Sequence, residues 1–427
     1  RNSSNVDEIV THVENETGLK MRVLSEEEEA FFGNYAVRYT FNIYNGISVD
    51  IGGGSTEITL FKNKEVIESH SFPFGAVSLK NQFFNGKEHY DLEAIKDTKK
   101  WVKKQFKSIP WLNKVDLPII GIGGSARNVA EVYQLQHAYP LAGMHGYPMK
   151  PEWIDETLDL FCSTAYDDLD SLDGLSQDRK DTIIPATIVF QQLLNVVQSD
   201  SFVLSRRGLR EGLVIHYLNE EKNEPYSLMS VPQQTVIRLS TQYNIQEFST
   251  NQRITIADMV LNELEKNNLL SVDIEYLELM YYGATLYNLG SFIENDSSSP
   301  HTFYVVSNTN LHGFDHYDRV RLALLASYKN RSLYRQYVSN FDGWFSAEEQ
   351  DLLMKLGSII KFAEALNDSH VNTINKLSLK KNKKKGYDLF VRYSGNIVSE
   401  EFQANKQRNH LERAVGDSVN IYFEVAE

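Results

Sequence analysis

The chain has 427 residues, of which 42% are hydrophobic, so it is long enough to bury more than one hydrophobic core. Its formal net charge of −14 argues against a general nucleic-acid-binding protein, because such proteins carry a net basic face. Its one cysteine, Cys162, cannot form an intramolecular disulfide, and we find neither a signal peptide nor an apolar run long enough for a membrane helix. We therefore expect a cytoplasmic protein that has no membrane or nucleic-acid partner.

The first residues predict a helix that is followed by a strand and a second helix. Residues 1–18 read as a polar start of an amphipathic helix that ends near Gly18, and residues 20–24, KMRVL, have the alternation of a strand. Ser25 and Glu28 then form an S-x-x-E capping box, which predicts a helix through about Ala36. Because no strand and no initiator methionine precede the first helix, we expect a chain that is truncated at its start.

The next two hundred residues or so predict an α/β domain. Residues 46–51 and 57–61 are alternating apolar runs joined by GGGST, which is a hairpin signal. Further along the chain we expect a third strand in VIESHSF, a helix near 91–108, a strand at 118–122 leading into a helix, helices from 151 to 199, and a last strand and helix within 202–218.

A change of composition predicts a domain boundary at residues 219–227, where a charged segment contains Pro225. Residues 228–370 have mostly helical apolar spacing, and the tail from Leu377 contains short strand-like runs. Two segments are basic: lysines at helical spacing between 96 and 107, and KKNKKK at 380–385. We interpret them as a solvated helix face and a charged loop, although the first could also guide a long anionic polymer.

The segment DIGGGSTE, residues 50–57, predicts a phosphate cradle. Three consecutive glycines permit backbone with positive φ and leave room for an oxyanion to reach main-chain N–H groups. Asp50 and Glu57 flank the turn on adjoining strands, where their carboxylates could hold a hydrated magnesium ion beside the phosphate. A flexible glycine hairpin with a solvated acidic rim is the alternative, and the flanking acids and hydroxyls favour the cradle.

Two further segments carry candidate chemistry. In GIGGS, residues 121–125, a strand turns into a helix whose free N–H groups favour an anion, although a tight turn that needs small residues explains the glycines equally well. The acidic residues 26–29 open a helix and complement its dipole, and one of these glutamates could accept a proton from an attacking water. The residues alone do not identify which one.

Four stretches of this sequence resemble the exopolyphosphatase and guanosine pentaphosphate phosphatase family over nearly the whole chain. They are RNSSN, SEEEEA followed by VDIGGGSTE, GIGGSARNVA, and GLREGL. The resemblance implies an α/β actin-like (ribonuclease H-like) phosphatase domain, a helical HD-like domain and a small C-terminal α+β segment. On this reading residues 1–36 are a remnant of a largely missing first actin-like domain, 37–222 are the second, 223–376 are the helical domain and 377–427 are the small C-terminal segment.

The resemblance also implies the roles of individual residues. Glu29 matches the catalytic glutamate that activates water, and Asp50 and Glu57 match the acids that act through Mg²⁺ or another divalent cation. The phosphate-binding residues that it implies are Arg1, Gly52, Gly53, Gly54 and Ser55, together with Gly123, Gly124 and Ser125 of the second loop.

Two departures from the family pattern matter. The D-x-G-S-N phosphate loop has no match here, so we expect this chain by itself to release little phosphate. The metal-binding His-Asp pair of HD domains corresponds to Tyr287 and Asn288, so we expect the helical domain to be non-catalytic.

The reading that follows is a magnesium-dependent exopolyphosphatase, which removes the terminal phosphate of inorganic polyphosphate. A guanosine pentaphosphate 5'-phosphohydrolase is the close alternative. The other alternative is a non-catalytic protein that binds guanosine polyphosphates or inorganic polyphosphate. We expect the protein to be a homodimer.

Overall fold

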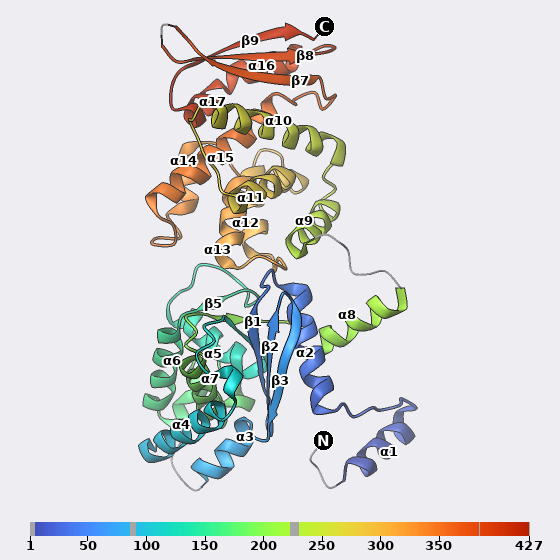
Figure 1. Ribbon diagram of the computed structural model, residues 1–427, viewed down its shortest axis with the longest axis vertical. Helices are drawn as coiled ribbons and strands as arrows, with labels where there is room; N and C mark the ends of the chain where they lie inside the picture. Colours follow the sequence, from blue (N-terminus) through green and yellow to red (C-terminus); the bar gives the residue numbers. More distant parts are fainter. Residues whose placement is uncertain (1–4, 86–90, 223–229, 384, 427) are drawn as a thin grey trace. The chain divides into compact units, whose positions relative to one another are not determined.

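The computed structural model describes residues 5–85, 91–222, 230–383 and 385–426 (Figure 1). It divides into two compact units, the first formed by residues 1–139 and 144–228 and the second by residues 140–143 and 229–427. None of the helices in these described ranges combines the length and the apolar composition that crossing a membrane would require.

A six-stranded mixed sheet forms the centre of the first unit, with the strand order β3-β2-β1-β4-β6-β5. The first three strands are antiparallel neighbours, while β4 pairs in parallel with both β1 and β6. The strands are β1 (Gly46–Ile51), β2 (Thr56–Lys62), β3 (Glu65–Phe72), β4 (Ile119–Ile122), β5 (Pro148–Met149) and β6 (Phe202–Leu204).

Helices cover both faces of this sheet (Figure 1). The larger core lies between the sheet and α4 (Leu92–Lys107), α5 (Gly123–Gln136), α6 (Pro151–Ser163) and α7 (Ile183–Val197). A smaller core lies under α2 (Glu26–Thr40), which packs against α8 (Leu209–Lys222). Two further α-helices of this unit are α1 (Val6–Thr17) and the short α3 (Ala76–Leu79).

Alternate residues of β1 give the sheet one apolar face and one polar face. Ile47, Val49 and Ile51 are buried in the larger core. Ser48 and Asp50, the residues between them, therefore project toward the opposite face, where α2 lies. This face is polar at the end of β1, and the space beside it becomes the candidate site.

The second unit consists of a helical bundle and a small sheet. The bundle contains α9 (Val231–Gln242), α10 (Glu247–Lys266), α11 (Ile274–Thr285), α12 (Ser298–Asn308), α13 (His316–Ala326), α14 (Arg331–Val338) and α15 (Ala347–Ala365). The sheet has the order β7-β8-β9, formed by β7 (Ile374–Lys381), β8 (Tyr387–Tyr393) and β9 (Val419–Val425). Helices α16 (Val398–Lys406) and α17 (Arg408–Val415) connect β8 to β9.

Two local predictions are wrong. Residues 20–24 form no strand, because they lie exposed or half-exposed without a neighbouring strand to pair their backbone. The basic stretch at 380–385 is not wholly a loop, since Lys380 and Lys381 complete β7. The tail, which we expected to be an α+β segment, contains the helices α16 and α17 beside its strands.

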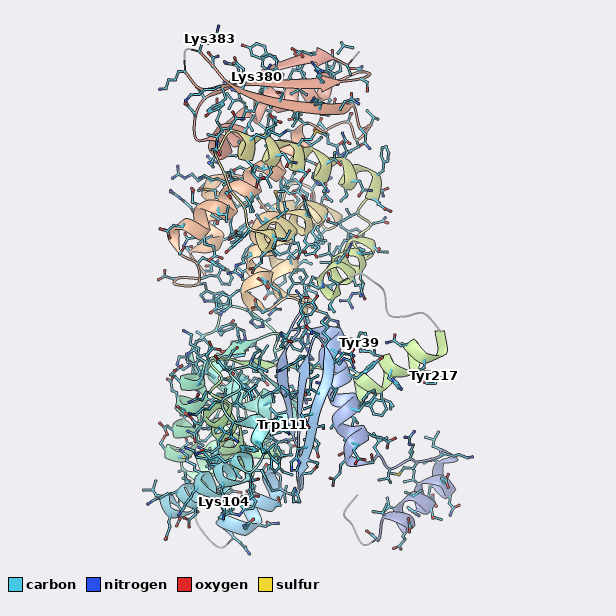
Figure 2. The ribbon with its side chains drawn as sticks, viewed as in Figure 1. Tyr39, Lys104, Trp111, Tyr217, Lys380 and Lys383 are labelled. Carbon is cyan, nitrogen blue, oxygen red and sulfur yellow. The ribbon has the colours of Figure 1, made fainter. Side chains whose placement is uncertain are left out.

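The basic helix face is solvated, as we expected. Five of the six lysines of α4 are exposed and Lys99 is half-buried. Lys104 on α4 and Lys380 on β7 lie at the outer surfaces of their units (Figure 2).

Candidate functional site

A cavity of about 520 Å³ opens in the first unit between α2 and the ends of β1 and β2. Its walls are one turn of α2, a row of side chains across the two strands, and the triple-glycine loop between them. The residues are Glu29, Ala30, Gly33, Asn34, Ser48, Asp50, Gly52, Gly53, Gly54, Ser55, Glu57 and Thr59, with Ile122 and Leu209. The structure thus gathers in one place the acids of both segments and the glycine loop that the sequence singled out.

Backbone hydrogen bonds within the triple-glycine loop and from the start of α3 hold the loop in place. Gly52 N donates to Ser55 O at 2.9 Å, and the carbonyls of Gly52 and Gly53 accept hydrogen bonds from Ala76 and Val77 at the start of α3, each at 2.9 Å. None of Gly52, Gly53 and Gly54 has positive φ, contrary to our expectation. A methyl group on Gly54 would meet no atom within 4 Å, so the glycines serve here to leave space open.

Asp50 and Glu57 face each other across the hairpin. They are directly paired residues of the antiparallel strands β1 and β2, as are Ser48 and Thr59 two positions back. Side chains at paired positions lie on the same face of a sheet, so all four project toward α2. Glu57 is buried, and its Oε1 accepts a hydrogen bond from Ser71 Oγ at 3.3 Å.

The pKa of Asp50 is raised to about 6, chiefly by burial and in addition by the negative charges of Glu57 and Glu29. The positive charges of Arg127 and Arg179 act on this pKa in the opposite direction. Three carboxylates and two guanidinium groups are therefore within electrostatic reach of one another. In such a site an ionised carboxylate without a counter-charge is disfavoured, and either protonation of the carboxylate or binding of a cation is favoured.

Helix α2 presents only one of its acidic residues to this cavity. Glu28 is committed to the capping box, in which its carboxylate accepts a hydrogen bond from Ser25 N at 2.9 Å. Glu26 and Glu27 line a neighbouring cavity that also contains His70. Glu29 lines the cavity with Asp50 and Glu57. The tertiary structure thereby places at this cavity the glutamate that the resemblance indicated, which the charge pattern alone did not distinguish.

The second glycine loop meets the first at Asp50. Gly123 opens α5 with a φ of +89°, and a Cβ atom there would lie 2.6 Å from Asp50 Oδ1. A Cβ atom on Gly124 would lie 2.6 Å from Arg179 Nη2. Both glycines are needed for these close approaches.

Ser125 has a different environment from the one expected of a phosphate contact. It is buried, and its Oγ accepts a hydrogen bond from Arg179 Nη1 at 3.1 Å. Gly123, Gly124 and Ser125 of the second loop are not part of the wall of the 520 Å³ cavity. Of this segment the wall includes only Ile122, which precedes them. Arg1, the other expected phosphate contact, lies outside the described residues.

Several site residues were missed by sequence reasoning. Arg127 lies one turn into α5, where its Nε donates to Gly123 O at 3.2 Å, so an arginine closely following a glycine loop was an available signal. Arg179 comes from a separate short helix, residues 177–179, and no local signal points to it. Asn34 is buried in α2, donates to Ser48 Oγ at 3.1 Å, and keeps a buried Oδ1 atom without a hydrogen-bond partner.

Comparisons with known proteins agree with the motifs of this site. Residues 1–221 match the model of the Ppx/GppA phosphatase family, and residues 231–407 match its domain III. The bifunctional 3-dehydroquinate synthase/phosphatase of Fusobacterium nucleatum is 28% identical over 220 residues, covering 50% of this chain and 33% of that protein. The guanosine-5'-triphosphate,3'-diphosphate pyrophosphatase of Pseudoalteromonas translucida is 24% identical, covering 80% of this chain and 66% of that protein.

Solved structures give matches of the same kind. The Ppx/GppA family member of Aquifex aeolicus is 26% identical, covers 51% of this chain and 71% of that one, and superposes with a TM-score of 0.45. An exopolyphosphatase from Cytophaga hutchinsonii is 18% identical, covers 52% of this chain and 72% of that one, and has a TM-score of 0.46. The chain spans between a third and two thirds of the curated relatives described above. On the match of its first 221 residues, which is more than half of its length, the chain belongs to the Ppx/GppA phosphatase family.

Proposed function

We propose that this protein hydrolyses the terminal phosphoanhydride bond of inorganic polyphosphate in the cavity between α2 and the β1–β2 hairpin. One observation carries the proposal: Glu29, Asp50 and Glu57 surround a glycine loop that leaves an open, amide-rich floor. Phosphoryl transfer requires positioning and charge neutralisation more than covalent chemistry, and this set of groups supplies both.

Glu29 is the proposed general base. It lies opposite the Asp50–Glu57 pair on the wall of the cavity, where a water molecule between it and the phosphate would be in reach of its carboxylate. The rigid capping box at Ser25 fixes the first turn of α2, so the position of Glu29 is set before substrate binds.

Asp50 and Glu57 are the proposed partners of a divalent cation. Within the described residues no group of three or more His, Cys, Asp or Glu side chains could hold a metal ion, which argues against a cage made of protein ligands. The donors here are all oxygens, and the unpartnered Oδ1 of Asn34 could accept a hydrogen bond from a metal-bound water. This set fits hydrated Mg²⁺, which keeps several waters; when bound, the ion would neutralise charge on the phosphate oxygens.

The glycine loop and two arginines are the proposed phosphate contacts. The N–H groups of Gly53, Gly54 and Ser55 lie in the loop that floors the cavity, and such a run of amides is a common oxyanion site. Arg127 and Arg179 add positive charge near Asp50. They would partly offset the repulsion between an anionic substrate and the three carboxylates.

Guanosine pentaphosphate is the second candidate substrate. Two of the relatives are named guanosine-5'-triphosphate,3'-diphosphate pyrophosphatases, and the proposed chemistry at the terminal phosphate is the same for both substrates. The glycine loop recognises the phosphate and not the group that carries it, so the cavity by itself does not favour one over the other.

The test is the release of orthophosphate from each substrate with and without Mg²⁺, by wild type and by Glu29→Gln. Whatever the level of Mg²⁺-dependent release from this chain, we expect the substitution to lower it by about two to four orders of magnitude, because a general base is lost while the phosphate contacts stay. Glu26→Gln, in the same turn of α2 but on the neighbouring cavity, is the matched control and should retain turnover. Binding of polyphosphate without release by wild type would establish the non-catalytic alternative.

A further inference from the structure

The helical unit contains a second cavity, of about 700 Å³, whose chemistry differs from that of the phosphate site. It is walled by the segment that joins α9 to α10, by the first turns of α10, by the segment around residues 288–298, and by side chains from the end of α15 and just beyond it. A volume of this size is within the range of small-molecule sites, which is about 300–1,000 Å³.

The polar lining of this cavity is rich in neutral groups that both donate and accept hydrogen bonds. Four carboxamides line it, from Asn244, Gln246, Asn288 and Asn295. Each carboxamide offers an N–H₂ donor and a carbonyl acceptor, and serine hydroxyls lie among them. Such a lining matches a neutral ligand whose edge carries donors and acceptors side by side.

The charged groups of the lining are already committed to one another. Arg253 is buried, its Nη1 lies 2.6 Å from Glu364 Oε2, and its Nε donates to Ala284 O at 2.8 Å. The His370 ring is hydrogen-bonded to Ser249 at 2.6 Å. Arg253 is the one arginine or lysine of the described lining, so the permanent positive charge of this wall is already paired with Glu364.

Aromatic rings complete the wall. Phe248 and Phe292 are 64% and 60% exposed, although both line the cavity, and the Phe292 ring lies 5.6 Å from that of Tyr243 in an edge-to-face arrangement. Rings that are exposed at a cavity full of hydrogen-bonding groups are suited to stack on a flat, polar ring.

We propose that this cavity binds a purine nucleoside through its uncharged base. A purine is planar and carries donors and acceptors on its edges, which correspond to the aromatic rings and the carboxamides of the wall. Any phosphate on the ligand is expected to remain outside the wall, since Arg253 is already paired with Glu364. This binding site is separate from the phosphate site and does not depend on the function proposed for it.

The test is isothermal titration calorimetry of the full chain with guanosine and with adenosine. We expect saturable binding with one site per chain for at least one of them, unaffected by a saturating amount of sodium tripolyphosphate. Phe292→Ala should weaken the binding by about tenfold or more, because it removes a stacking ring. Phe402→Ala is the matched control, since Phe402 is 65% exposed in the same unit but lies outside the cavity wall.

Three outcomes would overturn the proposal. One is the absence of saturable heat and of saturation-transfer NMR signals with both nucleosides at millimolar concentration. Another is an equal affinity of wild type and Phe292→Ala, or an equal loss in Phe402→Ala. The third is displacement of the nucleoside by tripolyphosphate, which would place its binding at the phosphate site.

Discussion

At the scale of single residues, Asp50 is under the strongest electrostatic constraint in the site. It is a β1 residue whose position the strand fixes, beside two other carboxylates and against the backbone of Gly123. Its ordinary pKa of 3.8 is raised to about 6 by burial and by Glu57 and Glu29. A group whose charged form is disfavoured in the folded state lowers the stability of that state wherever the group is ionised.

Asp50→Asn is therefore expected to stabilise the protein in the absence of metal at neutral pH. The folded state releases the Asp50 proton near pH 6 and the unfolded state near pH 3.8, so the penalty is full above about pH 6 and vanishes below about pH 3.8. The difference corresponds to on the order of 2–3 kcal/mol in the free energy of unfolding at pH 7.5, and to about half of that at pH 5. Urea unfolding of wild type and variant at the two pH values measures it.

The same variant should lose phosphate release even though it is more stable. Removing the negative charge of Asp50 weakens the proposed cation site, and protonating Asp50 in wild type should do the same as the pH falls below about 6. An Asp50→Asn protein that keeps its normal Mg²⁺ titration would argue against this residue as a partner of the metal. A stability difference that grows toward low pH would contradict its raised pKa.

At the scale of elements, the packing of α2 against α8 positions the proposed base. Gly212 on α8 lies so close to α2 that a Cβ atom would come within 1.8 Å of Phe32 O. Glu211, the residue before it, accepts a hydrogen bond from Gly208 N at 3.0 Å and holds the start of α8. The motif GLREGL thus acts on the site indirectly, by allowing two helices to meet backbone to backbone.

Gly212→Ala is expected to force these helices apart. Overpacking of this kind typically costs about 1–3 kcal/mol, and the displacement of α2 would move Glu29 away from Asp50. We expect a lower melting temperature together with reduced phosphate release. Val214→Ala, at a position of α8 that is 56% exposed, is the control and should change the melting temperature and the phosphate release little. Unaltered activity and stability in Gly212→Ala would show that α8 can shift without moving the base.

At the scale of the whole molecule, the chain divides into two compact units, and each of them contains buried hydrophobic side chains. Within the second unit, Arg253 joins α10 to α15 through Glu364 and contacts the carbonyl of Ala284 at the end of α11. Its side chain is only 5% exposed, so its positive charge is balanced by that carboxylate instead of by water.

Arg253→Met is expected to destabilise the second unit selectively. It leaves Glu364 without its ion-pair partner in a largely buried position, and breaking such a pair typically costs about 3–5 kcal/mol. In differential scanning calorimetry we expect one component of the unfolding to move to lower temperature. Trp344 lies in the second unit, and Trp101, Trp111 and Trp153 lie in the first. When these three are replaced by Phe, the remaining fluorescence of Trp344 should follow the shifted component. A single transition that shifts as a whole would mean that the units unfold together.

The sequence by itself determined the elements whose signals are local. The capping box at Ser25, the alternating strands around the glycine loop and the strand-to-helix turn at Gly123 all appear where the pattern predicted them, because caps, pleats and tight turns depend on residues a few positions apart. The pairing of Asp50 with Glu57 follows from the hairpin in the same way.

Only the tertiary structure decided which of these residues share a cavity. The family resemblance pointed to Glu29, but the local pattern of charges does not distinguish it from Glu26, because the choice depends on how α2 lies over the sheet. Arg179 reaches the second glycine loop from a short helix more than fifty residues along the chain. The apparent strand at 20–24 fails for the same reason, since a strand exists only where a neighbour accepts its hydrogen bonds, and that neighbour is a property of the fold.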